Sequence, residues 1–292
     1  MKYLLSIIAA LVLVFGLLYW IGNNSPSKTV SKELISEKTI THGHGLSVDS
    51  ADPSKLYIAT HHGLLVLLNE KDLYRIGTGN DDYMGFSAHP TEPKIFYSSG
   101  HPENGGNTGL QKSEDGGFTW KKISDGLNGP VDFHALTISA VNSNLIYGWY
   151  QGYIQRSMDG GKSWVKYATQ FPIVTLVTNA TDENIVYAAS PLGLYISKDK
   201  GEKWDKLIEG FVSTIAVNPK DSKKMLSFSE KFWLARSNNE GASWEEIGQN
   251  FDGETPLFMS FEKQKGEFIY ALTEKNSIYK SSDAGETWTK IR

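Results

Sequence analysis

Short apolar runs separated by polar turns recur along most of this chain. Three of them follow one another in residues 173–177, 184–189 and 193–197, and a more polar run with Trp204, Leu207 and Ile208 follows in residues 203–208. Each run has five or six residues, the usual length of a β-strand, and Gly, Asp, Asn and Pro cluster in the connections. The pattern therefore predicts a unit of four short strands, each paired with the next, and an all-β fold.

An eight-residue sequence marks the third connection of most units. It reads Ser-x-Asp-x-Gly-x-(Ser/Thr)-Trp, with Lys203 replacing the Ser/Thr in one copy and Asn239 replacing the Asp in another. The five copies span residues 113–120, 157–164, 197–204, 237–244 and 281–288. Their tryptophans are 44, 40, 40 and 44 residues apart, a spacing typical of repeat proteins. The chain is therefore expected to be an array of similar units.

A second marker, a tyrosine in the second strand of five units and a leucine in the other, reveals a sixth unit. The marker positions are Tyr57, Tyr97, Tyr147, Tyr187, Leu226 and Tyr270. The first unit, at about residues 42–77, has a diverged turn with Asn69 at the Asp position and Tyr74 at the Trp position. Six units predict one domain, a six-bladed β-propeller over residues 41–292, because ring closure protects the sheet edges. A seven-bladed ring is the less favoured alternative, and residues 34–40 are a candidate for one further strand at the closure of the ring.

The N-terminal 22 residues follow a different pattern. Residues 3–22 form an uncharged apolar run, long enough as a helix to cross a hydrocarbon layer of about 30 Å. The run ends with Tyr19 and Trp20 and has no small-x-small cleavage sequence. We therefore expect a single-pass signal anchor in residues 1–22, a flexible tether in residues 23–40, and a propeller outside the cytoplasm at the cell membrane. The alternative is secretion after signal cleavage.

Composition excludes several function classes. The chain of 292 residues has no cysteine, so disulfides, thiolate metal sites and a thiol nucleophile are excluded. Its net charge of −4, without a basic run, argues against nucleic-acid binding. Nucleic acid is therefore not an expected partner, whereas a protein, peptide or glycan ligand outside the cytoplasm stays open.

The repeated turn resembles the Asp-box, or BNR repeat, of sialidase-like, sortilin-like and photosystem-assembly-factor-like propellers. The five copies carry this resemblance, which extends over most of the chain. It implies that the box is a folding element in which Asp accepts backbone N–H groups, Gly adopts a positive φ and Trp packs between neighbouring sheets. The likeness to assembly-factor and sortilin-type propellers also implies protein or peptide binding.

The alternative function is that of a glycoside hydrolase. Sialidases of this family hold the substrate carboxylate with three arginines and carry a Phe-Arg-Ile-Pro motif. The four arginines here are at outer-strand positions outside any such motif: Arg75, Arg156, Arg236 and Arg292. Sialidase activity is therefore not expected. Another glycosidase would need two carboxylates about 5–10 Å apart. The candidates are Asp82 and Asp132, with Asp81, Asp252 and Glu254 in equivalent connections. These acids also fit ordinary solvated loops.

All seven histidines precede residue 135, and several are at equivalent positions of different units. Thirteen residues before the aromatic marker are His44, Met84 and His134 in units 1 to 3. Four residues after it are His61, His101 and Gln151. The first position begins an inner strand and the second ends the next strand, so in an antiparallel sheet both lie at the same end. We therefore expect these six residues at one mouth of the channel, opposite the box turns.

Three interpretations of this mouth remain open. The first is a metal site, with His44, His61, His101, His134 and Met84 as candidate ligands. Copper would suit imidazoles with a thioether, and zinc would suit imidazoles with Asp82 or Asp132. The second is recognition of a polar ligand by the four histidines and Gln151. The third is that the histidines only hydrogen-bond strand ends and stack on neighbouring aromatic rings.

Overall fold

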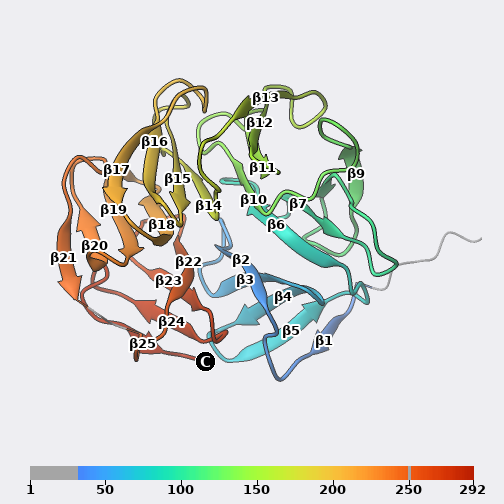
Figure 1. The fold of residues 1–292 in the computed structure, drawn as a ribbon. Helices are drawn as coiled ribbons and strands as arrows, with labels where there is room; N and C mark the ends of the chain where they lie inside the picture. Colours follow the sequence, from blue (N-terminus) through green and yellow to red (C-terminus); the bar gives the residue numbers. More distant parts are fainter. Residues whose placement is uncertain (1–31, 249–250) are drawn as a thin grey trace, which may run out of the picture. The chain divides into compact units, whose positions relative to one another are not determined.

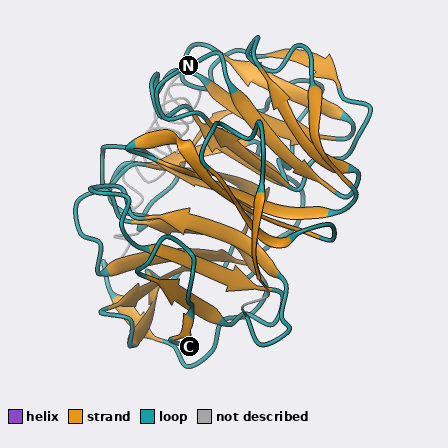
Figure 2. Cartoon of the chain, turned by 90° about the vertical axis from the view of Figure 1, so that its left-hand side faces the viewer, coloured by secondary structure: helices purple, strands orange, loops and turns teal. Residues whose placement is uncertain are grey.

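The computed structural model describes residues 32–248 and 251–292, and residues 32–292 form one compact unit. Within the described residues the secondary structure consists of strands β1 to β25, with no helix (Figures 1 and 2). The predicted all-β fold is therefore confirmed for this part of the chain.

The strands form six antiparallel sheets, one for each predicted unit. Blade 1 has β1 (Leu34–Ser36), β2 (Gly43–Val48), β3 (Lys55–Thr60), β4 (Gly63–Leu68) and β5 (Asp72–Ile76). Blade 2 has β6 (Asp82–Ala88), β7 (Phe96–His101), β8 (Leu110–Ser113) and β9 (Lys121–Ser124). Blade 3 has β10 (Ala135–Ile138), β11 (Ile146–Tyr150), β12 (Tyr153–Ser157) and β13 (Val165–Ala168). Blade 4 has β14 (Thr175–Thr178), β15 (Val186–Ser190), β16 (Gly193–Ser197) and β17 (Asp205–Glu209). Blade 5 has β18 (Val212–Asn218), β19 (Asp221–Ser229), β20 (Trp233–Ser237) and β21 (Glu245–Gly248). Blade 6 has β22 (Pro256–Phe261), β23 (Ile269–Thr273), β24 (Ile278–Ser281) and β25 (Thr289–Lys290).

The six sheets surround a central axis as the blades of a propeller (Figure 1). The innermost strands are β2, β6, β10, β14, β18 and β22, and each packs against the innermost strands of both neighbouring blades. Because β22 of the last blade also packs against β2 of the first, the ring is closed. The predicted six-bladed propeller is confirmed, and the seven-bladed alternative is wrong.

The hydrophobic core is divided among the six interfaces between successive blades. At the interface of blades 3 and 4, Tyr147 and Ile154 pack with Phe171 and Leu176. Similar clusters occupy the other five interfaces. Each sheet is covered on both faces, so its middle strands are buried at successive positions, and β15 is buried at every residue. This explains the short continuous apolar runs of the sequence.

The five box turns have the same construction. Ser157 Oγ accepts the N–H of Gly161 at 2.8 Å, and Asp159 Oδ1 accepts the N–H of Ser163 at 2.9 Å. Gly161 has a φ of 89°, and Trp164 Nε1 donates to its carbonyl at 3.1 Å. The same bonds recur in the other four copies. The box tryptophans lie in the clusters between blades. These contacts show that the box is a folding element.

Backbone bonds place the box turns at the same end of each blade as the first connection. The N–H of Gly160 donates to the Asn144 carbonyl at 2.9 Å, and that of Lys200 donates to the Asn184 carbonyl at 2.9 Å. In an up-and-down sheet, the inner strands therefore begin at the opposite end. The box turns and the predicted mouth are on opposite faces, as expected.

Blade 1 differs from the other blades at its outer edge. The turn between β4 and β5 is short, with Asn69 and Glu70 at φ values of 51° and 61°. Strand β1 pairs with β5 as a fifth, outermost strand. A flexible tether over residues 23–40 is therefore wrong for residues 34–36, and the compact unit begins before residue 41. The segment is held because β1 hydrogen-bonds the edge of β5 and Arg75 Nε donates to Glu37 Oε1 at 3.1 Å.

Blades 6 and 1 meet without sharing a strand. The Tyr270 hydroxyl donates to Glu70 Oε1 at 3.0 Å, and Lys280 pairs with the same carboxylate. Leu272 and Ile58 are fully buried in the cluster between these blades. Closure therefore depends on side-chain packing together with polar contacts, among them those of Glu70 and the hydrogen bond from the Gly43 N–H to Asn276 Oδ1 at 3.0 Å.

The predicted anchor, residues 1–22, lies outside the described residues, as do residues 23–31 of the predicted tether. Among the residues that the structure describes, no helix is long and apolar enough to cross a membrane.

Candidate functional site

Four of the six innermost strands carry a bulge near their first residue. In blade 1, Gly43 pairs with Thr60 and Gly45 pairs with Ala59, so His44 is the extra residue. The corresponding bulge residues are Met84 in β6, Ser213 in β18 and Leu257 in β22. A bulge changes the direction of a side chain, and His44 lines the central channel. The positions equated from the sequence are therefore structurally equivalent in four blades.

Two glycines flank His44 because neighbouring blades approach this backbone closely. A Cβ on Gly43 would lie 2.4 Å from Leu272 Cδ2 of blade 6. A Cβ on Gly45 would lie 2.9 Å from the Phe86 Cβ of blade 2. The start of β2 is thus held between two blades, which positions the His44 imidazole.

His44, His61 and Asp82 form a first group, which we call the Asp82 group. His61 lies in the turn after β3, and its Nδ1 is 2.5 Å from Asp82 Oδ2 at the start of β6. The rings of His44 and His61 meet edge to face, with centroids 4.2 Å apart. One possible metal-ligand atom from each of the three residues lies within 4.8 Å of the others. Three donors from two blades thus converge at the mouth.

Two buried atoms of this group have no hydrogen-bond partner. They are His44 Nε2 and Asp82 Oδ1. Burial, followed by the nearby His61, lowers the pKa of His44 to about 4. The His44 imidazole is therefore neutral at physiological pH and carries a lone pair on one ring nitrogen.

A second group, which we call the Asp132 group, is centred on a buried carboxylate. Asp132 Oδ2 lies 2.7 Å from His134 Nε2 and 3.2 Å from His101 Nε2. The hydrogen bond with Asp132 raises the pKa of His134 above its usual value. His101 Nδ1 donates to the carbonyl of Gly106, at 2.8 Å, in the insertion that follows β7. Asp132 therefore orients two imidazoles from blades 2 and 3.

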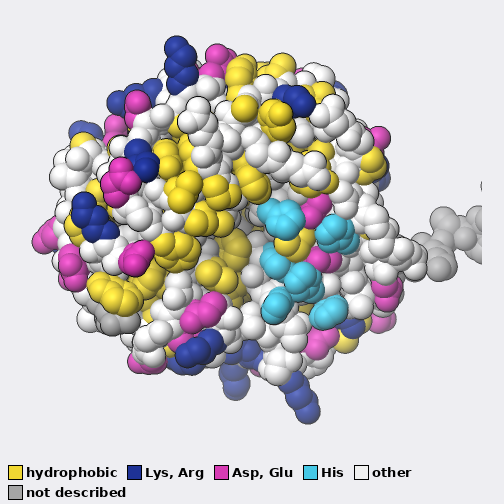
Figure 3. All heavy atoms as spheres, viewed as in Figure 1, with side chains coloured by type: hydrophobic (Ala, Val, Ile, Leu, Met, Phe, Trp, Pro, Cys, Tyr) yellow, Lys and Arg dark blue, Asp and Glu magenta, His cyan; other side chains and the backbone are white. Residues whose placement is uncertain are grey.

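The histidines gather on one face of the propeller beside the channel opening (Figure 3). The structure brings four of the predicted residues into the two groups: His44, His61, His101 and His134. Met84 is the extra residue of the bulge in β6, the position that His44 has in β2. Gln151 is exposed and donates instead to the Tyr150 hydroxyl at 3.1 Å.

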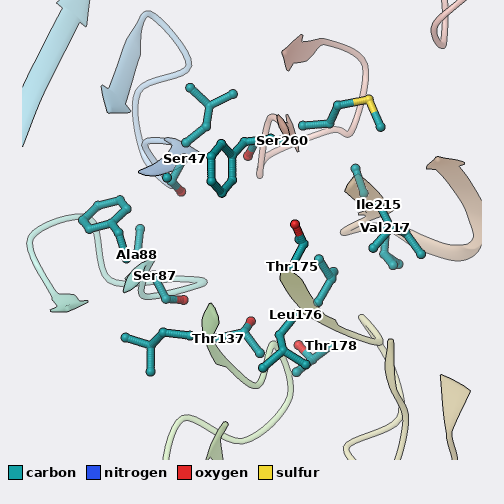
Figure 4. A pocket seen from close by; sticks show the side chains of 18 of the residues that line it. Ser47, Ser87, Ala88, Thr137, Thr175, Leu176, Thr178, Ile215, Val217 and Ser260 are labelled. Carbon is teal, nitrogen blue, oxygen red and sulfur yellow. The ribbon is translucent and has the colours of Figure 1, made fainter. Parts of the chain in front are cut away.

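The channel beneath the mouth is narrow and mostly uncharged. Hydroxyl side chains line it together with aliphatic ones, among them Ser47, Thr137, Thr175, Leu176 and Val217 (Figure 4). Its cavity is about 170 Å³. Pockets for drug-sized ligands measure about 300–1,000 Å³. A larger ligand would therefore contact the mouth and not the interior of the channel.

The same face carries exposed apolar side chains that were not predicted. We call them the apolar patch: Tyr153, Val174, Leu192, Phe211 and Trp233 of blades 3 to 5. They lie at the starts of inner strands, in the turns between second and third strands, or in links between blades. In blades 1 to 3, the equivalent chain segments carry the histidines of the mouth. A large apolar residue inside a polar turn is the signal that would have revealed them.

The other candidate carboxylates are committed to local structure. Asp252 Oδ2 accepts the Tyr279 hydroxyl at 3.0 Å. Glu254 accepts the hydroxyls of Thr273 at 2.5 Å and Ser277 at 3.2 Å. Burial alone would raise the pKa of Glu254, but these hydrogen bonds hold it below its usual value. Glu254 is therefore ionised and unsuited to donate a proton as a general acid.

The four arginines are engaged by acidic side chains or by backbone carbonyls. Arg75 pairs with Glu37, Arg156 with Glu202, and Arg236 with Glu245 and Glu286. Arg292 donates to the Lys71 and Lys38 carbonyls. The structure thus has no arginine triad that would hold a sialic acid carboxylate.

No family model matches the chain, and no curated protein matches it in sequence. Solved structures do resemble it. A GH74 enzyme of Niastella koreensis superposes with a TM-score of 0.58 at 17% identity, over 84% of this chain and 46% of the enzyme. The GH74 xyloglucanase from Xanthomonas campestris gives 0.56 at 15% identity, over 89% and 56%. YCF48 bound to D1 peptide gives 0.56 at 15% identity, over 91% and 87%.

These likenesses establish a propeller fold. The chain spans about half the length of the GH74 enzymes, whereas it matches YCF48 over most of both chains.

Proposed function

We propose that this protein binds a peptide or protein segment at the mouth of its channel, outside the cytoplasm, with residues 3–22 as its membrane anchor. The observation that carries the proposal is the composition of the mouth. The apolar patch lies on blades 3 to 5, and the two histidine groups lie on blades 1 to 3 of the same face. A peptide with both polar and apolar side chains would contact both parts of this surface.

The apolar patch supplies the binding free energy in this proposal. Leu192 and Trp233 are 50% and 44% exposed. Covering the exposed part of each contributes about half of the roughly 1.5–3 kcal/mol that complete burial of a large apolar side chain gives. Exposed apolar side chains grouped beside a polar rim are typical of protein interaction sites. YCF48, which shares the fold over most of its length, is a propeller solved with a bound peptide.

The histidine groups supply orientation. His44 Nε2, Asp82 Oδ1 and Asp132 Oδ1 are buried without a hydrogen-bond partner. A ligand that provides partners for such atoms is favoured over one that leaves them unpaired, by about 1–3 kcal/mol for each group. The polar half of the mouth therefore selects among peptides that the apolar patch alone would bind.

Glycoside hydrolysis is the second candidate, and the GH74 likeness and the acids at the mouth favour it. Asp82 and Asp132 are the carboxylates available for it. Each already contacts imidazoles, at 2.5 Å for Asp82 and at 2.7 and 3.2 Å for Asp132. The narrow channel also offers no deep pocket for a sugar ring. Peptide binding therefore accounts for more of the site.

Peptide binding is tested with the full chain, purified in detergent and used to select from a displayed library of random peptides. The affinity of one selected peptide is then measured by fluorescence anisotropy. In the variant with Leu192→Ser and Trp233→Ser, we expect affinity to fall at least about tenfold, because the exposed side chains at the mouth are lost.

The matched control is the variant with Val141→Ser and Met158→Ser, which removes side chains that are 48% and 46% exposed at the opposite end of the blades. It should bind like the unmodified protein. Equal affinity in the patch variant would contradict the proposal. Release of reducing sugar from xyloglucan that disappears in Asp82→Asn or Asp132→Asn would establish the hydrolase instead.

A further inference from the structure

We propose that His44, His61 and Asp82 form a binding site for one divalent transition-metal ion of the zinc type at the mouth of the channel. This site does not depend on peptide binding. The three side chains come from the bulge near the start of β2, the turn after β3 and the start of β6. Two neighbouring blades thus contribute ligands to one point.

The distances are close to those of a metal site. Imidazole nitrogens and carboxylate oxygens bind zinc at about 2.0–2.2 Å, so ligands of one ion lie within about 4.4 Å of each other. The ligand atoms of His44, His61 and Asp82 all lie within 4.8 Å of one another. Small side-chain rotations would therefore bring them to coordination distance. They would also replace the direct 2.5 Å contact between His61 and Asp82.

The unsatisfied atoms of the group support the same conclusion. His44 Nε2 and Asp82 Oδ1 are buried and have no hydrogen-bond partner. A buried polar atom without a partner destabilises the folded state by about 1–3 kcal/mol. Both atoms are metal-ligand types, and a cation between them would satisfy the two at once.

The Asp132 group is less suited to a metal. His101 has both ring nitrogens occupied, with Nδ1 on the Gly106 carbonyl and Nε2 on Asp132. His134 Nε2 is also on Asp132. These contacts leave His101 and His134 on Asp132. The proposed site therefore uses two of the four predicted histidines, His44 and His61, together with Asp82.

The donor set indicates the class of ion. Two imidazoles and a carboxylate suit Zn²⁺, Co²⁺, Ni²⁺ or Cu²⁺, whereas Ca²⁺ and Mg²⁺ prefer oxygen alone and Cu⁺ prefers sulfur. Three protein ligands also leave the fourth position of a tetrahedral site open. The site would therefore accept a water molecule or a donor atom from a bound ligand.

The test uses the full chain, purified through a tag without histidine, stripped with a chelator and titrated with Co²⁺. We expect one equivalent to bind, with the visible absorption of tetrahedral Co²⁺, and Zn²⁺ to displace it. His44→Ala and Asp82→Asn should each weaken binding at least about tenfold. Asp82→Asn preserves the side-chain shape, so it reports on the ligand if His44→Ala fails to fold.

His89→Asn is the matched control. His89 lies at the opposite end of β6, where its Nδ1 accepts the N–H of Glu92 at 3.1 Å. In blade 4, Asn179 makes the equivalent bond to Asp182 at 3.0 Å, so the replacement preserves the turn. The control should bind Co²⁺ like the unmodified chain.

Two results would overturn the site. One is the absence of Co²⁺ and Zn²⁺ binding by the unmodified folded chain. The other is binding that survives Asp82→Asn and disappears in His134→Ala, which would place the ion on the Asp132 group.

Thermal unfolding gives a second measurement. An ion that binds only the folded state stabilises it. Zn²⁺ should therefore raise the melting temperature of the unmodified chain and of His89→Asn, but not that of Asp82→Asn.

Discussion

The box aspartates show how one side chain organises a turn. Asp159 accepts the Ser163 hydroxyl at 2.6 Å and the N–H groups of Ser163 and Lys162 at 2.9 and 3.0 Å. These hydrogen bonds, led by the Ser163 hydroxyl, lower the pKa of Asp159 to about 2. Asn239 accepts the N–H of Ser243 at 2.9 Å in the fourth box without any charge. The turn therefore requires a side-chain oxygen at this position, and the negative charge of an aspartate makes the stability of the turn depend on pH.

Asp159→Asn should make the protein less sensitive to acid. The folded-state pKa of about 2 is below the usual value of 3.8, so the stabilisation by Asp159 is complete above about pH 4. It is lost as pH falls towards 2. The variant lacks this titration, so its unfolding midpoint in urea should decline less between pH 4 and pH 2.

Asn239→Asp is the reciprocal control and should make the decline steeper. An unchanged acid dependence in both variants would contradict the assignment of acid sensitivity to the box aspartates.

Histidine residues have different roles in this chain, and their identity alone does not reveal them. His89 Nδ1 accepts the N–H groups of Thr91 and Glu92 in the first connection of blade 2. Other residue types accept backbone N–H groups at the equivalent place in the remaining blades: Asp49, Ser139, Asn179, Asn218 and Glu262. His89 therefore belongs to a series of turn-forming residues, whereas His44 belongs to the mouth.

At the scale of the element, the box turn depends on a serine as well as on the aspartate. Ser157 is buried, and its Oγ accepts the Gly161 N–H at 2.8 Å while donating to Asp159 at 2.8 Å. This hydrogen bond matters because the Gly161 N–H is also buried, so solvent would not replace the serine as its acceptor.

Ser157→Ala should lower the free energy of unfolding by about 1–3 kcal/mol, the usual effect of leaving a buried donor unpaired. Equilibrium unfolding in urea measures it. Ser163→Ala is the control with a smaller expected loss, because Lys203 occupies this position in the third box. A larger effect at Ser163 than at Ser157 would show that the serine at the start of the box is not the critical residue.

At the scale of the whole molecule, stability depends on the closure of blade 6 on blade 1. No strand is shared between them, so the buried cluster and the Glu70 contacts hold the ends of the ring together. Leu272 is fully buried there and touches the start of β2 beside His44. Ring closure and the geometry of the mouth are therefore coupled through the same side chain.

Leu272→Ala should lower the free energy of unfolding by about 2–5 kcal/mol, since it leaves a cavity at the closing interface. Leu192→Ala makes the same chemical change at a side chain that is 50% exposed, and its effect should stay within about 0.5 kcal/mol. Urea unfolding of both variants measures the difference. Similar stabilities would mean that closure does not depend on this packing.

The sequence by itself determined the number of blades and the face that carries His44, His61, His101 and His134. Both follow from local, periodic information, whereas the construction of the box turns was implied by their resemblance to the Asp-box repeat. The box tryptophans and the aromatic markers recur once per blade, so equivalent positions can be compared. Because antiparallel strands alternate in direction, positions on successive strands can be assigned to one end of a blade.

Only the tertiary structure decided which side chains meet at the mouth. His61 pairs with Asp82 of the next blade, and Asp132 takes both His101 and His134. The bulge at His44, the pairing of β1 with the outer edge of blade 1 and the apolar patch were likewise not apparent from spacing. The physical reason is that these contacts join different blades. Blade-to-blade distances depend on the packing of whole sheets, which a repeat period does not specify.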